Sequence, residues 1–262
     1  MLSPTLLAAG TVLSLILGHA RSLHDAGTRP VIVMDLDETV IDSTPRRFHS
    51  IQKALNEVAL TPQERQALST IGFYDLYRLE NRYDLTPIYQ KLAISKDTAS
   101  RFDAYVVQVY LSGFGLEYDV PMAGADHYVQ ELRDAGARII FVSSRYDRTQ
   151  RQGTVANLIA LKMLEADQAC DVILRPDGMT SIDFKRWAFS QITGDVIGVF
   201  ENEPENINAM VEAFPKAQAV FMEGAWIHPG PISPQAVQIT DYIVGQVVEE
   251  PRLTNDQPMM HP

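Results

Sequence analysis

Short apolar segments alternate along most of the chain with longer segments of helical periodicity. The apolar segments, rich in β-branched residues, occupy residues 31–34, 138–142, 171–174, 196–200 and 217–222. Helical patterns lie at 125–135, 147–165 and 183–192, and a further one begins at Pro204. Continuous apolar runs are typical of strands that are buried on both faces of a sheet. The alternation therefore predicts an α/β fold of Rossmann-like type, in which helices cover both faces of a parallel sheet.

Residues 43–118 interrupt this alternation, because they contain no convincing buried strand. Helical patterns at 46–58 and 98–111 instead predict a helical cap, inserted after the first strand where it can close over the sheet edge. We assign most aromatic residues of this insertion to its own core; they are Phe73, Tyr74, Tyr77, Tyr83, Tyr89, Phe102, Tyr105 and Tyr110. The catalytic core is then expected at residues 21–42 and 119–248, and a flexible polar tail at 249–262.

The first twenty residues differ from the rest of the chain. Residues 5–17 carry no charge, and Gly18-His19-Ala20 ends in small residues of the kind that a signal peptidase reads. These features predict an export signal at residues 1–20, cleaved near Ala20, and hence a periplasmic or secreted protein. Because no Lys or Arg precedes the apolar run, an uncleaved membrane anchor is the alternative, although the run is marginal for spanning a bilayer.

Composition narrows the choice of partners. The chain has 33 acidic and 22 basic residues, which gives a formal net charge of -11 and offers no basic surface for nucleic acid. An acidic protein that binds a small anion works against its own field, so we expect a divalent cation in its site. The single cysteine, Cys170, cannot form an internal disulfide and neither supports nor excludes export.

Two carboxylates follow the first predicted strand, at Asp35 and Asp37. In parallel α/β sheets, ligands bind beyond the carboxyl ends of the strands, so these side chains are expected in a binding site. Two neighbouring carboxylates repel each other, and their desolvation beside a buried strand is costly without a metal ion or a proton. The pair therefore indicates a site that shares a cation.

The sequence V-I-V-M-D-L-D-E-T-V resembles the first motif of the haloacid dehalogenase superfamily, in which D-x-D-x-T follows a hydrophobic strand. Later motifs of that superfamily have counterparts in the same order: Ser143 in F-V-S-S-R, Lys185 in S-I-D-F-K-R and Glu201 in V-F-E-N-E-P-E-N. The resemblance covers roughly residues 30–225. The first motif is similar to that of exported bacterial acid phosphatases, and the predicted export signal fits that group.

The resemblance implies phosphoryl transfer through an aspartate nucleophile. Asp35 would attack phosphorus, and Asp37 would protonate the departing alcohol and then activate the water that hydrolyses the aspartyl-phosphate. Phosphoryl transfer also requires charge neutralisation on the phosphoryl oxygens. The resemblance assigns this task to Ser143, Ser144 and Lys185.

The resemblance also implies a magnesium ion, held by Asp35, the main-chain carbonyl of Asp37 and Glu201. Most members of the superfamily have aspartate where this chain has Glu201, which is one methylene longer. Since magnesium holds its ligands at about 2.0 to 2.1 Å, either the strand ends further back or ligation passes through water. Asn202 and Glu203 are alternative ligands, and Glu203 is also placed to cap the following helix.

The expected activity is magnesium-dependent hydrolysis of a small phosphomonoester. A phosphotransferase or mutase would use the same site, and a binding or storage protein that has lost activity is the alternative from another class. A dehalogenase is disfavoured, because those enzymes need neither an acid at the position of Asp37 nor a metal. Arg145 either helps to bind substrate or pairs with an acidic neighbour such as Asp147.

Overall fold

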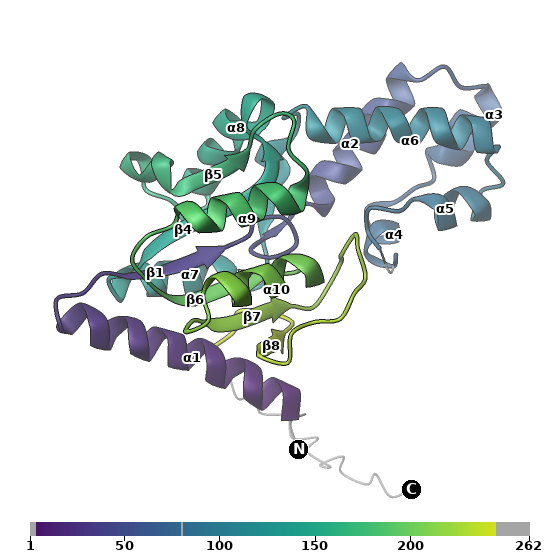
Figure 1. Ribbon diagram of the computed structural model, residues 1–262. Coiled ribbons are helices and arrows are strands. Elements are labelled where there is room, and N and C mark those ends of the chain that lie inside the picture. The colour runs from purple at the N-terminus through teal and green to yellow at the C-terminus, as the bar shows by residue number, and fades with distance from the viewer. Residues whose placement is uncertain (1–3, 80, 245–262) are drawn as a thin grey trace, which may run out of the picture.

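The structure, a computed structural model, describes residues 4–79 and 81–244 (Figure 1). Its centre is a six-stranded sheet in the order β5-β4-β1-β6-β7-β8, in which neighbouring strands are parallel. The strands are β1 (Pro30–Met34), β4 (Arg138–Tyr146), β5 (Val172–Arg175), β6 (Asp195–Glu201), β7 (Gln218–Met222) and β8 (Ala236–Ile239). The predicted α/β class is confirmed. The edge strand β8 was not predicted, because its four residues include a glutamine and only Ile239 among them is buried.

Helices cover both faces of the sheet, as predicted. Helices α9 (Ser181–Gln191) and α10 (Pro204–Ala213) lie on one face, and α1 (Pro4–Asp25), α7 (Ala125–Asp134) and α8 (Asp147–Ala160) lie on the other (Figure 1). Strand β1 shows why its sequence is continuously apolar: Ile32 and Met34 face the second set of helices, whereas Val31 and Val33 face the first. The helix predicted at 147–165 ends earlier, at Ala160, and the short 3-10 helix η2 (Ala166–Asp171) precedes β5.

The inserted segment contains α2 (Thr44–Glu57), α3 (Pro62–Leu68), α4 (Phe73–Tyr77), α5 (Thr86–Lys91) and α6 (Lys96–Leu111). These helices, called the cap here, project from the end of the sheet at which β1 finishes (Figure 1). They enclose an apolar cluster of their own, centred on Ile51, Phe102 and Val106. The chain enters and leaves the cap through β2 (Ile41–Asp42) and β3 (Val120–Pro121), which pair antiparallel; the 3-10 helix η1 (Leu116–Tyr118) precedes β3.

Helix α1 contains most of the segment predicted as an export signal. Leu13, Ile16 and Ala20 are buried in the same apolar cluster as the sheet residues, and the Tyr128 hydroxyl donates a 3.1 Å hydrogen bond to the Leu13 carbonyl. Because Ala20 is fully buried, a peptidase would have to cleave near it before α1 packs on the sheet. Among the described helices, none combines the length and apolar character needed to cross a membrane. The tail predicted at 249–262 lies outside the described residues.

We predict that Ile16→Ala lowers the free energy of unfolding of the full chain by about 2–5 kcal/mol, because it removes buried methyl groups and leaves a cavity. The matched control is Leu15→Ala on the same helix, where the side chain is 59% exposed and the expected change is within about 0.5 kcal/mol. Urea denaturation measures both. Small and equal effects at the two positions would show that α1 does not pack against the sheet.

Candidate active site

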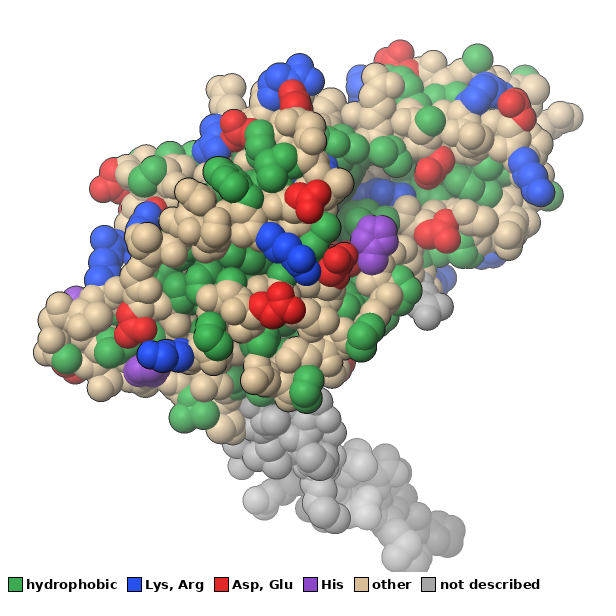
Figure 2. Space-filling model, in the orientation of Figure 1, with side chains coloured by type: hydrophobic (Ala, Val, Ile, Leu, Met, Phe, Trp, Pro, Cys, Tyr) green, Lys and Arg blue, Asp and Glu red, His purple; other side chains and the backbone are tan. Residues whose placement is uncertain are grey.

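A pocket of about 430 Å³ lies where the strands of the sheet end and the cap begins. It is large enough for a small organic ligand. Figure 2 shows the hollow between the body of the sheet and the cap, with basic side chains deep inside it. The six predicted site residues all line this pocket; they are Asp35, Asp37, Ser143, Ser144, Lys185 and Glu201.

Lys185 joins the two carboxylates at the base of the pocket. Its Nζ atom, buried on α9, donates to Asp35 Oδ1 at 2.5 Å, to Glu201 Oε2 at 2.9 Å and to the Val142 carbonyl at 2.7 Å. The main chain fixes Asp35 as well, because its N–H donates to the Phe200 carbonyl at the end of β6. One ammonium group therefore holds the ends of β1 and β6 together through charge-assisted hydrogen bonds.

The charges at this point do not balance. When both are ionised, the two buried carboxylates face one ammonium and leave one negative charge in excess. Burial, together with repulsion from Glu201, raises the pKa of Asp35 to about 7 despite the nearby ammonium of Lys185. Either a proton on Asp35 or a divalent cation would offset the excess, and the carboxylate oxygens are donors that fit a cation. Among the described residues no three acidic, histidine or cysteine side chains form a metal-binding group, so the main-chain carbonyl of Asp37, water and substrate would have to complete the shell.

Glu201 reaches back onto its own main chain. Its Oε1 atom accepts hydrogen bonds from the N–H groups of Asn202 and Glu203 at 3.0 and 3.1 Å, and Oε2 accepts from Lys185. These contacts fold the glutamate side chain back, so that its carboxylate lies beside the end of β6 although it is one methylene longer than aspartate. A carboxylate oxygen carries two lone pairs, so Oε2 retains one that can bind a cation.

The two alternative ligands have other contacts. The Asn202 side chain accepts from the Thr39 hydroxyl at 3.0 Å and donates to the Ala225 carbonyl at 2.6 Å. Glu203 stands at the N-cap position of α10, but its side chain makes no capping bond. Its carboxylate instead accepts from the N–H groups of Ile227 and His228, and so holds the loop that forms one rim of the pocket.

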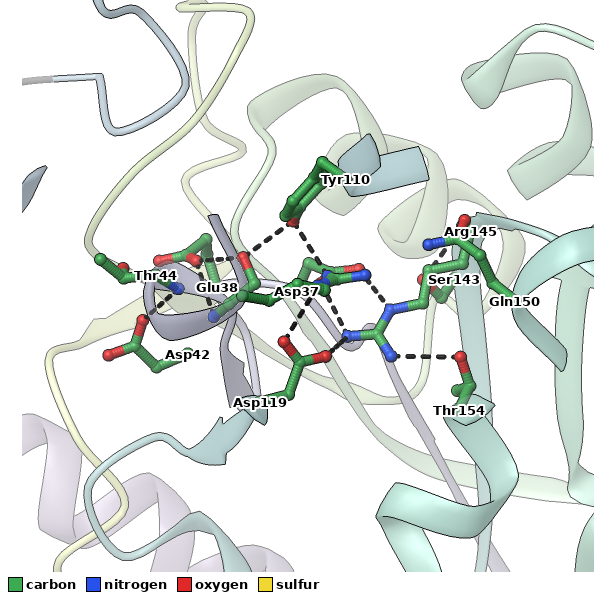
Figure 3. Close-up of polar contacts among 12 residues, drawn as sticks. Asp37, Glu38, Asp42, Thr44, Tyr110, Asp119, Ser143, Arg145, Gln150 and Thr154 are labelled. Carbon is green, nitrogen blue, oxygen red and sulfur yellow. Dashed lines mark hydrogen bonds and ion pairs between the residues drawn. The ribbon is translucent and has the colours of Figure 1, made fainter. Parts of the chain in front are cut away.

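Asp37 lies in a separate cluster with two arginines (Figure 3). Arg145 donates to both of its carboxylate oxygens, at 2.8 and 2.7 Å, and Arg46 donates to Oδ1 at 2.6 Å. The same two arginines also contact the buried carboxylate of Asp119, at 2.6 and 3.0 Å. Two carboxylates and two guanidinium groups therefore balance one another, and the cluster joins β4, the cap helix α2 and the residue that follows η1.

This cluster gives Arg145 acidic partners, as one of the two alternatives expected, but Asp147 is not among them; Arg145 also lines the pocket, so the substrate-binding alternative stays a prediction. Its carboxylate partners are Asp37 and Asp119, whereas Asp147 pairs with Arg151. Residues two apart along a strand lie on the same face of the sheet. The spacing of Ser143 and Arg145 therefore indicated that Arg145 would lie near the site. Asp119 offered no such signal in the sequence, because it comes close to Arg46 and Arg145 only when the segment after the cap folds back.

The arginines keep Asp37 ionised. Burial alone would raise the pKa of this carboxyl, but the charges of Arg145 and Arg46 and their hydrogen bonds outweigh burial and hold the pKa well below its usual range. The side chain nevertheless remains 20% exposed toward the pocket. In this arrangement Asp37 is a hydrogen-bond acceptor and a base, and it becomes an acid only if these contacts loosen.

The two serines after Val142 differ in their contacts. Ser143, which is almost fully buried, accepts a 3.3 Å hydrogen bond from the Arg145 N–H, so its hydroxyl hydrogen can be donated into the pocket. The Ser144 hydroxyl lies 2.5 Å from that of Ser181 at the start of α9. Both positions suit hydrogen bonding to oxygen atoms of a ligand.

A tight turn connects the site to the cap. Glu38 has a left-handed backbone conformation, with φ of 59°, and its buried carboxylate accepts from the Ser43 N–H and hydroxyl. Arg82 of the cap donates to the other oxygen of Glu38 at 2.7 Å. Asp42 accepts from the Thr44 N–H (Figure 3). These contacts fix the start of α2 relative to β1.

The cap aromatics divide into two groups. Tyr89 and Phe102 are buried in the cap core and Tyr105 packs against it, so the prediction that most of the eight lie there holds only for these three; Tyr74 is 74% exposed. Tyr83 and Tyr110 instead line the pocket, which the sequence did not reveal. The Tyr110 ring lies 4.1 Å from the Arg46 guanidinium, and its hydroxyl accepts from Arg46 and donates to Ser43.

Neither a protein-family model nor a protein of curated function matches the sequence. Similar folds occur among solved structures. A haloacid-dehalogenase-superfamily hydrolase from Ehrlichia chaffeensis shares 11% identity over 82% of this chain and 93% of its own, with a TM-score of 0.45. A haloacid-dehalogenase-like hydrolase from Streptococcus pneumoniae shares 13% identity over 74% and 84%, with a TM-score of 0.41. The class C acid phosphatase from Bacillus anthracis shares 16% over 76% and 64%, with a TM-score of 0.39.

These likenesses are low. Identities below 25% and TM-scores below 0.5 transfer no activity to this chain, so its chemistry has to be argued from its own side chains.

We predict that Arg46→Met lowers the free energy of unfolding by about 3–5 kcal/mol, because it leaves buried carboxylates short of one cation. Arg148→Met is the matched control, since Arg148 forms an exposed pair with Asp177 and its loss should cost less than about 1 kcal/mol. Urea denaturation compares them. Adding Asp119→Asn to Arg46→Met should restore part of the lost free energy of unfolding. If Arg46→Met and Arg148→Met each lowered it by the same small amount, the charge balance described here would be contradicted.

Proposed function

We propose that this protein is a haloacid-dehalogenase-type phosphatase that hydrolyses phosphomonoesters through an aspartyl-phosphate on Asp35, with magnesium as cofactor. The observation that carries the proposal is the buried group of Asp35, Lys185 and Glu201, which is short of one positive charge and opens into the pocket. A carboxylate beside a cation site and a fixed ammonium group is an arrangement suited to in-line attack on phosphorus.

In the first step an Asp35 oxygen forms a bond to phosphorus while the bond to the departing alcohol breaks. Lys185 neutralises charge on the phosphoryl group, and the Ser143 hydroxyl donates a hydrogen bond to one of its oxygens. Magnesium, held by Asp35, the main-chain carbonyl of Asp37 and Glu201, would supply further positive charge to the phosphoryl oxygens. Water then attacks the phosphorus of the aspartyl-phosphate. Phosphate is released, and the carboxylate of Asp35 is regenerated.

Asp37 moves the protons of both steps. The base role, which takes a proton from water in the second step, needs the ionised carboxylate that Arg46 and Arg145 maintain, and Asp37 becomes a stronger base as those contacts loosen. The acid role requires Asp37 to take up a proton as its contacts with the arginines loosen. Arg46 belongs to cap helix α2, so movement of the cap changes the charge that surrounds Asp37.

We predict that the purified wild-type protein hydrolyses 4-nitrophenyl phosphate only when magnesium is present. Asp35→Asn should lower kcat by about 10³-fold or more, because the amide cannot form the covalent intermediate. Asp177→Asn, at an exposed ion pair, is the matched control, and thermal unfolding verifies that each variant is folded.

The intermediate offers a second readout. Rapid acid quenching should leave a phosphoryl group on the peptide that contains Asp35, and added glycerol distinguishes a phosphotransferase, which would form glycerol phosphate. A folded wild-type protein without activity at acid and neutral pH would refute the phosphatase proposal and favour a binding or storage protein.

We also propose that the chain is exported by residues 1–20, on the basis of the uncharged segment at 5–17 and the small residues before Arg21. Expression in a Gram-negative bacterium, followed by mass spectrometry of the periplasmic fraction, is expected to find a chain that begins at Arg21. A chain that starts with Met followed by Arg21 is the control and should stay in the cytoplasm. Full-length protein in the cytoplasm would contradict export.

A further inference from the structure

Arg175 lines the same pocket and has no part in the chemistry proposed above. It is the last residue of β5 and pairs in register with Tyr146 of β4, so it lies on the edge of the sheet that carries the site. In the strand order β5-β4-β1, two strand spacings separate it from the strand that ends before Asp35. Two spacings amount to about 10 Å across the sheet, so the backbone of Arg175 lies about that far to the side of the strand that carries the proposed nucleophile.

The charge of Arg175 is not balanced by a carboxylate. Lys185 pairs with Asp35 and Glu201, and Arg46 and Arg145 pair with Asp37 and Asp119. Within the described residues Arg175 forms no ion pair, and Asp177, two residues further on, pairs with Arg148. The pocket therefore contains one arginine whose charge is available to a ligand.

The guanidinium of Arg175 is held in place without being saturated. It lies 4.3 Å from the centre of the Tyr146 ring, and Nη1 makes a long 3.4 Å hydrogen bond to the Met179 carbonyl. Its Nε atom is buried and has no hydrogen-bond partner among the described residues. Because Nε is closed to solvent, a ligand would bind the terminal Nη groups, for which the described residues provide only the long hydrogen bond to Met179.

The wall near Arg175 suits the organic part of a substrate that carries an anion. Thr180, Ser181 and Ile182, at the start of α9, line the pocket together with Ile227 of the opposite rim. The Ser181 and Ser144 hydroxyls offer hydrogen bonds, and the two isoleucines offer apolar contact. The pocket volume of about 430 Å³ leaves room for more than a phosphoryl group.

We propose that Arg175 binds a second anionic group, carried on the alcohol part of the substrate. The preferred substrates would then be phosphomonoesters whose leaving group bears a carboxylate or another phosphate. This inference rests on the proposed phosphatase activity for its choice of ligand, but it concerns a different residue and a different part of the pocket. A guanidinium suits this role because its planar fork matches carboxylate and phosphate oxygens.

Matched aryl phosphates test the proposal. We expect wild-type kcat/KM for 3- or 4-carboxyphenyl phosphate to exceed that for phenyl phosphate by about 10-fold or more, as for a hydrogen bond between charged groups. Arg175→Gln should reduce this ratio to near one, and Arg175→Lys should retain part of it. Arg148→Gln, which removes an exposed arginine outside the pocket, should leave the ratio unchanged.

Binding provides a readout that does not need turnover. Calorimetry with magnesium present should show that 4-carboxyphenylphosphonate binds wild type about 10-fold or more tightly than phenylphosphonate, and that Arg175→Gln removes the difference. If hydrolysis fails but this difference is found, the phosphatase proposal is wrong and the anion site stands. Equal binding of the two phosphonates by wild type, or an Arg175→Gln variant that weakens both equally, would overturn the inference.

Discussion

Buried carboxylates at the end of β1 have to be balanced by positive charge, and the fold supplies that charge from separate elements. Lys185 comes from α9, Arg145 from β4 and Arg46 from the cap. An uncompensated charge in such a place costs several kcal/mol, so the three cations constrain how these elements meet. The apolar clusters determine which faces pack, and the charges determine where the ends of the elements lie.

The two charge groups have different character. Asp37 and Asp119 with their two arginines are neutral as a set, whereas Asp35 and Glu201 with Lys185 are not. The neutral set crosses between the core and the cap, so it is structural as well as part of the site. The unbalanced set lies wholly within the core, at the point where a cation and a phosphoryl group would enter together.

Much of the core was predictable because buried parallel strands have a simple signature. The run that ends at Met34 is apolar throughout, and it is buried on both faces as expected. The half-buried edge strand at Ala236 lacks that signature. Asp35 was identified from its place after the first buried strand, whereas Lys185 and Glu201 were identified through the resemblance of their motifs to those of a known superfamily.

Arg46, Asp119 and Tyr110 were not identified as site residues, because their importance comes from the way the cap folds back. No local pattern marks a residue that becomes buried through contacts far away in the sequence, such as the hydrogen bond between Tyr110 and Ser43. The pairing of β2 with β3 places the entry and the exit of the cap side by side. An insertion of another length could therefore begin and end at the same place without altering the register of the main sheet, provided that it still supplied a cation to Asp37 and Asp119, as Arg46 does here.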